Sequence, residues 1–203
     1  MNALWSTASF LSGKLIRTRG ADSAVYLTFD DGPHPHHTVC LLKLLAEHDA
    51  KATFFLLGEL AEQSPDLVRQ ILTEGHEIGN HSMTHPRMSG IGAIEQWAEI
   101  DRADAVLQRL DGRRRHLFRP PNGRLTLPAV AASLRRRQPL VLWTIDSQDY
   151  RLSPQDVVRR MQSIPPKGGD VILFHDDSAC SAIALDTLLP IWKRAGLRFA
   201  ALD

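Results

Sequence analysis

The chain has 203 residues, a formal net charge of +1 at pH 7 and 43% hydrophobic residues. This length favours one domain with a substantial core, and the near-neutral charge argues against a nucleic-acid partner, which requires a strongly basic face. Two cysteines, Cys40 and Cys180, are too few for a disulfide framework, so we expect reduced thiols. Two arginine runs, residues 113–115 and 135–137, lie at or near the ends of predicted helices, where cations suit the helix dipole.

The first 22 residues are expected to form an N-terminal segment ahead of one domain over residues 23–203. Its apolar residues recur at helical spacing: Leu4, Ala8, Leu11 and Leu15. A helix packed across the end of the domain is the favoured interpretation, and a weak peripheral contact of residues 1–20 with a membrane is the alternative. Because no basic n-region precedes an apolar run and no stretch is long enough to span a bilayer, the sequence predicts a cytoplasmic protein. No feature predicts the oligomeric state.

Strand-like and helix-like segments alternate along the chain, which is typical of parallel βα units. The predicted strands cover residues 24–28, 52–57, 76–79, 116–119, 140–145, 171–174 and 197–202. The predicted helices cover residues 39–47, 64–75, 91–110 and 183–194, with two more through Val130 and from Ser153.

About seven parallel strands joined by helices predict an α/β fold of one domain. A distorted or incomplete (β/α) barrel fits best, because the chain is short for eight full units. A doubly wound open sheet is the alternative, but the first strand-to-helix turn lacks the glycine fingerprint of dinucleotide sites.

Polar, chemically capable residues follow strand after strand at its carboxyl end. They are Asp30, Asp31, His81, His85, Arg119, Asp146, Asp149 and His175. In a βα barrel this rim carries the active site, because loops from several strands converge there. The sequence therefore predicts that these side chains share one site.

Asp30 and Asp31 are the central pair of this set. Two adjacent carboxylates at the end of a buried strand are costly, and a cation would neutralise one and leave the other as a base. His81 and His85 are four residues apart and would lie on one face if the segment were helical, and two histidines with one aspartate suit a zinc-type ion that keeps positions open for water. The alternatives are a solvated Asp-Asp-Gly turn and incidental histidines. The other histidines are expected to be structural or on the surface, although His36 lies close to the acid pair.

Five segments match, in order, the motifs of the NodB-type polysaccharide deacetylases (carbohydrate esterase family four). They are Thr28–Pro33, His81–His85, Arg119–Gly123, Asp146–Tyr150 and Leu173–His175. Nearly the whole chain is covered, and it most resembles the short chitooligosaccharide deacetylases. The resemblance implies a distorted (β/α) barrel and a metal-dependent hydrolase that removes N-acetyl groups from N-acetylglucosamine units of an oligo- or polysaccharide. The implied cofactor is one divalent metal, usually zinc, with cobalt, nickel or manganese as alternatives.

The same resemblance implies a role for each matching residue. The metal ligands would be Asp31, His81 and His85. Asp30 would be the general base, oriented by Arg119, and His175 would be the general acid, supported by Asp149.

The resemblance also implies substrate contacts, and two of them depart from the family pattern. The contacts would come from Pro121, Asn122, Tyr150 and Leu173. The family commonly has tyrosine at position 122 and tryptophan at position 150. The backbone N–H of Asn122 can still meet the acetyl oxygen, whereas the wall of the groove changes.

Two other functions stay open from the sequence. The first keeps the site and changes the substrate to a lipid- or nucleotide-linked amino sugar, from which an acetyl or formyl group is removed. The second is a catalytically inert carbohydrate-binding module, against which Asp30, Arg119 and His175 argue, because an inert binder needs neither base nor acid. The expected partner is an N-acetylated glycan substrate.

Overall fold

The computed structural model describes residues 16–17 and 23–202. The predicted N-terminal helix through Leu15 and its alternative membrane contact lie outside them. Ile16 and Arg17 form a short strand that the sequence did not predict.

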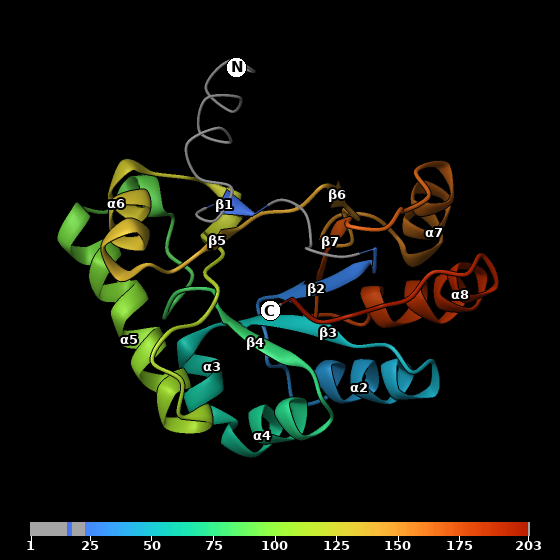
Figure 1. Cartoon of the computed structure of the whole chain (residues 1–203), viewed down its shortest axis with the longest axis horizontal. Coiled ribbons are helices and arrows are strands. Elements are labelled where there is room, and N and C mark those ends of the chain that lie inside the picture. Colours follow the sequence, from blue (N-terminus) through green and yellow to red (C-terminus); the bar gives the residue numbers. More distant parts are fainter. Residues whose placement is uncertain (1–15, 18–22, 203) are drawn as a thin grey trace.

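Parallel strands form the centre of the molecule (Figure 1). They are β1 (Ile16–Arg17), β2 (Tyr26–Asp30), β3 (Ala52–Leu56), β4 (Glu77–Asn80), β5 (Leu140–Val141), β6 (Ile145–Asp146) and β7 (Val171–His175). Five of them form a sheet in the order β4-β3-β2-β7-β6, and β1 pairs with β5. Every ladder is parallel, which confirms the predicted α/β fold.

The segment 140–146 closes this sheet into a distorted barrel. Phe118 bridges Asn80 of β4 to Leu140 of β5, so the first end of the segment continues one edge of the sheet. Its second end, β6, pairs with β7 at the other edge. The predicted strand over 140–145 is therefore wrong as one continuous element, because its two ends pair with different neighbours and the chain bends between them.

Two other predicted strands shrink to single bridges. The strand predicted over 116–119 keeps only Phe118, because Pro120 and Pro121 follow and cannot donate to a ladder. The strand predicted over 197–202 keeps only the bridge from Phe199 to Val25. There the backbone divides its hydrogen bonds between Val25, just before β2, and Lys51, just before β3, so a regular ladder with one neighbour does not form.

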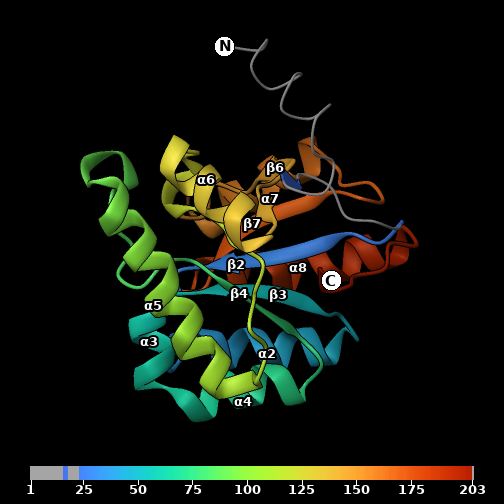
Figure 2. The ribbon, with the colours of Figure 1, turned by 60° about the vertical axis from the view of Figure 1, so that its left-hand side comes forward.

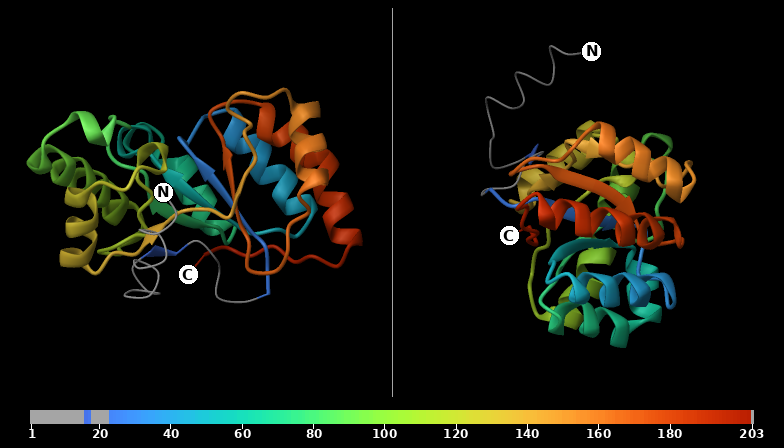
Figure 3. Two further views of the ribbon diagram at one scale, coloured as in Figure 1. Left: turned by 90° about the horizontal axis from the view of Figure 1, so that it is seen from above. Right: turned by 90° about the vertical axis from the view of Figure 1, so that its right-hand side faces the viewer.

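Helices surround the strands on both sides (Figures 1 and 3). They are α2 (His37–Glu47), α3 (Gly58–Gln63), α4 (Pro65–Thr73), α5 (Ala93–Asp111), α6 (Leu127–Arg136), α7 (Pro154–Ser163) and α8 (Cys180–Arg194), with 3₁₀ turns η1 (Met88–Gly90) and η2 (Pro121–Gly123). The long α5 packs against α3, α4 and α6 (Figure 2) and ends where Gly112 adopts a left-handed φ of 77°. No helix of residues 23–202 is long and apolar enough to cross a bilayer.

Side chains alternate between the two faces of each strand and so build two packed regions. On the helix side, Phe29 of β2 lies with its ring centroid 5.1 Å from Phe54 and 5.9 Å from Phe174. On the inner side, Tyr26 packs with Val171 and other buried residues of the barrel. Residues of the inner face reach the rim at the carboxyl ends of the strands, where the polar residues lie.

Candidate active site and metal centre

The carboxyl ends of the strands bring the predicted polar residues to one rim. Asp30 ends β2, Asp146 ends β6 and His175 ends β7, and the β2–β7 register sets Asp30 opposite His175. Since these strands are parallel, their ends meet on the same side of the barrel. His81 follows β4 directly at this rim, and its backbone N–H donates to the carbonyl of Leu56 at the end of β3.

Asp31, His81 and His85 present their ligand atoms to one point. Asp31 Oδ1 lies 3.4 Å from Nε2 of His81 and 3.4 Å from Nε2 of His85. This oxygen is buried without a hydrogen-bond partner among the described residues, and the three ligand atoms lie within 4.8 Å of one another. One carboxylate and two imidazoles around an orphaned oxygen fit a divalent cation such as zinc, with positions left open.

A backbone hydrogen bond sets the tautomer of His81. Its Nδ1 lies 2.7 Å from the carbonyl oxygen of Arg119, which can only accept, so Nδ1 carries the proton and Nε2 presents its lone pair toward Asp31. Burial lowers the pKa of His81 although Asp30 and Asp31 oppose the shift. The ring is therefore neutral near pH 7, as a metal ligand must be.

The segment from His81 to His85 is a loop, so the condition under which both histidines would share a helix face is not met. Ser82 and His85 have positive φ values of 74° and 57°, which a right-handed helix excludes. Hydrogen bonds hold the loop instead: Asn80 Oδ1 accepts from the Ser82 N–H at 2.8 Å, and Ser82 Oγ accepts from the His85 N–H at 3.1 Å. These bonds, rather than helical periodicity, bring both rings to Asp31.

Glu99 of α5 also holds this loop, and the sequence analysis missed it. Its Oε2 accepts from the Thr84 N–H at 2.8 Å and from Thr84 Oγ1 at 3.1 Å, while Oε1 pairs with Arg102. The Glu99 side chain is only 4% exposed, which is unusual for a carboxylate without a structural task. Nothing in the sequence distinguishes it from the other acids of α5.

Glu99→Ala is expected to weaken zinc binding by about 10- to 100-fold, the usual cost of losing a group that orients a ligand. The loop would lose two hydrogen bonds at Thr84, next to His85. Competition with a chromophoric chelator measures the affinity. Glu95→Ala, on an exposed side chain of the same helix, serves as the control. Equal affinities in the two variants would show that the loop keeps its shape without Glu99.

Arg119 makes an ion pair with Asp30 inside the barrel. Its Nη1 lies 2.7 Å from Asp30 Oδ1 and 2.8 Å from the hydroxyl of Thr28. The guanidinium is fully buried, with its central carbon 4.1 Å from the ring centroid of Phe55 and 5.6 Å from that of Trp143. Thr28, Phe55 and Trp143 were not predicted as supports, because their contacts come from strands distant in the sequence.

Asp30 turns its second oxygen toward the metal ligands. Oδ2 lies 3.7 Å from Nε2 of His81, whereas Oδ1 is engaged by Arg119. One carboxylate therefore faces the cation position without being needed as a ligand. This arrangement suits a base that takes a proton from a water molecule at that position.

His175 faces the same site from β7 and is held by Asp149. Its Nδ1 lies 2.8 Å from Asp149 Oδ1, and its backbone N–H donates to Oδ2 at 2.7 Å. Burial by itself lowers the pKa of His175, but the bond to Asp149 and the nearby carboxylates outweigh it and raise the pKa to about 9. Ser147 and Ser181 also donate to the buried Asp149. His175 is thus a cation near pH 7 whose free Nε2 can give up a proton.

The predicted substrate residues lie around this rim at different depths. Tyr150 is 56% exposed and stands edge-on to His175, with ring centroids 5.4 Å apart. Leu173 is buried on the inner face of β7, on the same side as His175. Asn122 is exposed and left-handed, with a φ of 57°, a conformation that asparagine tolerates better than most residues. Pro121 is buried beneath it.

The structure also locates His36, the two cysteines and an additional buried aspartate. His36 is exposed and lies outside the cluster of ligand atoms, and both cysteines are free thiols. Asp176, which follows His175, was not predicted, although it is fully buried and holds Thr38 of α2. A Cβ on Gly32 would lie 2.2 Å from Asp176 Oδ2, so only glycine fits directly after Asp31.

Comparison with known proteins identifies the family. The family model described as polysaccharide deacetylase matches residues 17–137 of this chain. The chain belongs to the polysaccharide deacetylase family. Among the curated relatives of this family member, a peptidoglycan-N-acetylglucosamine deacetylase of Bacillus cereus is 36% identical over 182 residues, covering 88% of this chain and 66% of the relative. A chitooligosaccharide deacetylase of Sinorhizobium fredii is 35% identical and covers 77% and 73%.

Solved structures agree with the fold of this chain. The Bc1960 peptidoglycan N-acetylglucosamine deacetylase superposes with a TM-score of 0.89 at 33% identity, covering 98% of this chain and 95% of that one. A family 4 carbohydrate esterase from Streptomyces lividans, in complex with acetate, gives a TM-score of 0.81 at 32% identity and covers 89% and 98%. The distorted barrel inferred from the sequence is therefore that of the family.

Family membership leaves the activity of an individual chain to be argued from its site. The pseudoenzyme BA3943 of Bacillus anthracis has a TM-score of 0.83 at 25% identity, covering 93% of this chain and 67% of that one. The chain also spans 66% of the Bacillus cereus relative and 38% of the PgdA deacetylase of Listeria monocytogenes.

Proposed function

We propose that this protein is a metal-dependent hydrolase that removes N-acetyl groups from N-acetylglucosamine units of a glycan, with residues 23–203 as its catalytic domain. One observation carries the proposal: the Asp31–His81–His85 cluster lies between a carboxylate paired with arginine and an imidazole paired with aspartate. An inert binding module has no use for a base and an acid on either side of a cation site. Relatives named for peptidoglycan and for chitooligosaccharides support an N-acetylglucosamine substrate.

A divalent cation, which we propose to be zinc, would be held by Asp31, His81 and His85 and would supply Lewis acidity that makes water more acidic and polarises a carbonyl. Asp30 is placed to take the proton of the attacking water, because its free Oδ2 faces the ligand atoms. Arg119 acts as a positioning residue, since it fixes the other oxygen of Asp30.

His175 and Asn122 complete the proposed reaction. His175 would donate the proton on Nε2 to the amine nitrogen as the amide bond breaks, and Asp149 keeps the imidazole charged and oriented until then. The N–H of Asn122 lies in the first turn of η2 and makes no hydrogen bond to a described residue. A donor aimed at a developing oxyanion is typically worth about 3 kcal/mol in the barrier.

Acetate release tests the proposal directly. Chitin oligomers of graded length and peptidoglycan fragments would be incubated with the protein as purified, after removal of metal with a chelator, and after zinc is added back. We expect acetate release that the chelator abolishes and zinc restores. The glycan from which acetate is released faster, chitin oligomer or peptidoglycan fragment, identifies the substrate class. Zinc-loaded protein that binds these glycans without releasing acetate would instead identify an inert binder. A cytoplasmic place of action stays a prediction.

The pH dependence should report on His175. Its cationic form is the acid, so kcat/KM is expected to fall as the pH rises through its pKa, which is about 9 without a bound cation. A bound cation offsets the part contributed by Asp31 and moves this limb to lower pH. Asp149→Asn removes a neighbouring charge and should move the limb down by about 1 unit or more.

The profile is measured from pH 6 to 10 with the wild type and the Asp149→Asn variant. An alkaline limb at the same pH in both would remove His175 from the role of acid. The raised pKa also stabilises the fold: this stabilisation is complete below about pH 6.5 and is lost as the pH rises through about 9.

A further inference from the structure

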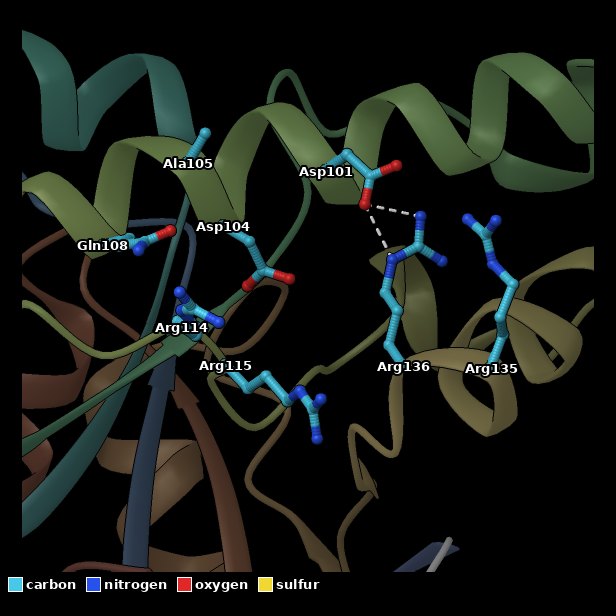
Figure 4. Close-up of a pocket in the computed structure, with 8 residues that line it drawn as sticks. All are labelled: Asp101, Asp104, Ala105, Gln108, Arg114, Arg115, Arg135 and Arg136. Carbon is cyan, nitrogen blue, oxygen red and sulfur yellow. Dashed lines mark hydrogen bonds and ion pairs between the residues drawn. The ribbon is translucent and has the colours of Figure 1, made fainter.

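Two arginine runs that are separate in the sequence meet in one groove between α5 and α6 (Figure 4). The groove has a volume of about 480 Å³. Its charged lining is Asp101, Asp104, Arg114, Arg115, Arg135 and Arg136. Arg114 and Arg115 precede Phe118, and Arg135 and Arg136 precede β5, so the groove lies toward the amino ends of these strands and away from the metal ligands.

The positive charges in this arginine groove are not balanced by carboxylates within residues 23–202. Arg114 and Arg115 make no ion pair within residues 23–202, in contrast to Arg113, which pairs with both Glu77 and Asp111. Arg135 has no carboxylate partner in the same residues and lies over the ring of Trp97, 5.2 Å from its centroid.

The two aspartates of the groove are already engaged. Arg136 pairs with Asp101 through Nε, 2.7 Å from Oδ1, and through Nη2, 2.5 Å from the same oxygen, whereas Nη1 is buried without an acceptor among the described residues. Asp104 accepts from Asn80 at 2.8 Å and from Gln138 at 3.0 Å. Four arginines against two aspartates leave a surplus of two positive charges around one hollow.

Helix dipoles account for two of the four arginines in the groove. Arg135 and Arg136 lie in the last turn of α6, where cations are stabilised. Arg114 and Arg115 lie beyond the Gly112 cap of α5 and gain nothing comparable. Placing them beside two further arginines costs repulsion that an anion would remove.

We propose that the arginine groove binds a phosphoryl group carried on a larger molecule. The planar guanidinium offers paired N–H donors that match phosphate oxygens, and a dianion matches the surplus of two charges. The volume of the groove exceeds what one small ion fills, so a diphosphate or a chain of phosphodiesters fits better than free phosphate. This site is independent of the proposed hydrolysis, because none of its residues contacts the metal ligands.

Calorimetric titration of the metal-loaded protein tests the proposal with two probes, inorganic pyrophosphate and a glycerol phosphate oligomer, at about 50 mM NaCl. The comparison is between Arg115→Gln/Arg135→Gln and the control Arg69→Gln/Arg159→Gln, which removes the same charge from exposed helix positions. We expect saturable binding that the groove variant weakens by about tenfold or more, that the control retains, and that about 200 mM NaCl reduces.

The two probes separate the sources of the phosphoryl group. Tighter binding of pyrophosphate would indicate a small diphosphate ligand, and tighter binding of the oligomer would indicate a polymer. Acetate release by the groove variant should match that of the wild type. Binding that the groove and control variants lose equally would indicate diffuse charge, and binding that both retain would indicate the metal centre; either result would overturn the proposal. Absence of binding by the wild type would overturn it as well.

Discussion

Replacing Asp30 by asparagine is expected to lower kcat for acetate release by about 10²- to 10⁴-fold, the usual contribution of a positioned general base. Asparagine keeps an oxygen for Arg119 but has no basic oxygen to face His81. The three ligand atoms are untouched, so the variant should bind zinc with nearly the affinity of the wild type. The combination of retained metal and lost turnover distinguishes a base from a ligand.

This variant also loses a charge next to a fully buried guanidinium. Leaving a buried charge unpaired typically costs about 3–5 kcal/mol, so unfolding by urea must be measured and the assay run where the variant is folded. Asp146→Asn, at the end of β6, is the matched control because it lies at the same rim without touching Arg119. It should keep kcat within an order of magnitude. Acetate release at the parental rate by Asp30→Asn would assign the base to another group.

The second large effect is expected from His81→Ala, which should remove the metal itself. The variant loses one of three ligands, and the weakening should exceed the roughly 10- to 100-fold that loss of a supporting residue costs. Metal content after dialysis and chelator competition measure it. Turnover should fall with occupancy and return in part at high zinc.

His36→Ala is the control for this experiment, since His36 is a nearby but exposed histidine outside the cluster. It should retain both metal and activity. Stoichiometric zinc in His81→Ala would place the cation somewhere other than at Asp31 and His85. Far-UV circular dichroism of the variant shows independently whether it is folded, so that an error in the metal assignment is distinguished from loss of the fold.

Local sequence patterns predicted the parts of this molecule that depend on neighbours in the chain. The buried strands β2, β3 and β7 are short apolar runs; β2 and β7 end in the polar residues Asp30 and His175, and the run of β3 stops at Gly58. Helix α5 ends at the glycine where its pattern stops. The rim position of Asp30 and His175 followed from the rule that parallel strands share a carboxyl end. The five sequence motifs then indicated the polysaccharide deacetylase family.

What could not be predicted depends on contacts between distant segments. The break at 142–144 arises because one short segment must pair with two edges of the sheet, and periodicity carries no signal of this. The loop after β4 looks helical by spacing, but the bonds of Asn80 and Glu99 decide its shape. Arg119 was expected to pair with Asp30, whereas its enclosure by Phe55 and Trp143 is a tertiary property.

Arg119 has one more consequence for how the protein gains activity. Besides Asp30, its donors reach the carbonyls of Val141 and Leu142, both at 3.3 Å, at the bend where the ring of strands closes. In a chain whose barrel is still open at this bend, the Arg119 guanidinium lacks these two acceptors, so it does not hold the Asp30 carboxylate in place. The proposed turnover should thus require that the ring is closed at this bend, and chains in which it is still open should be inactive rather than slow.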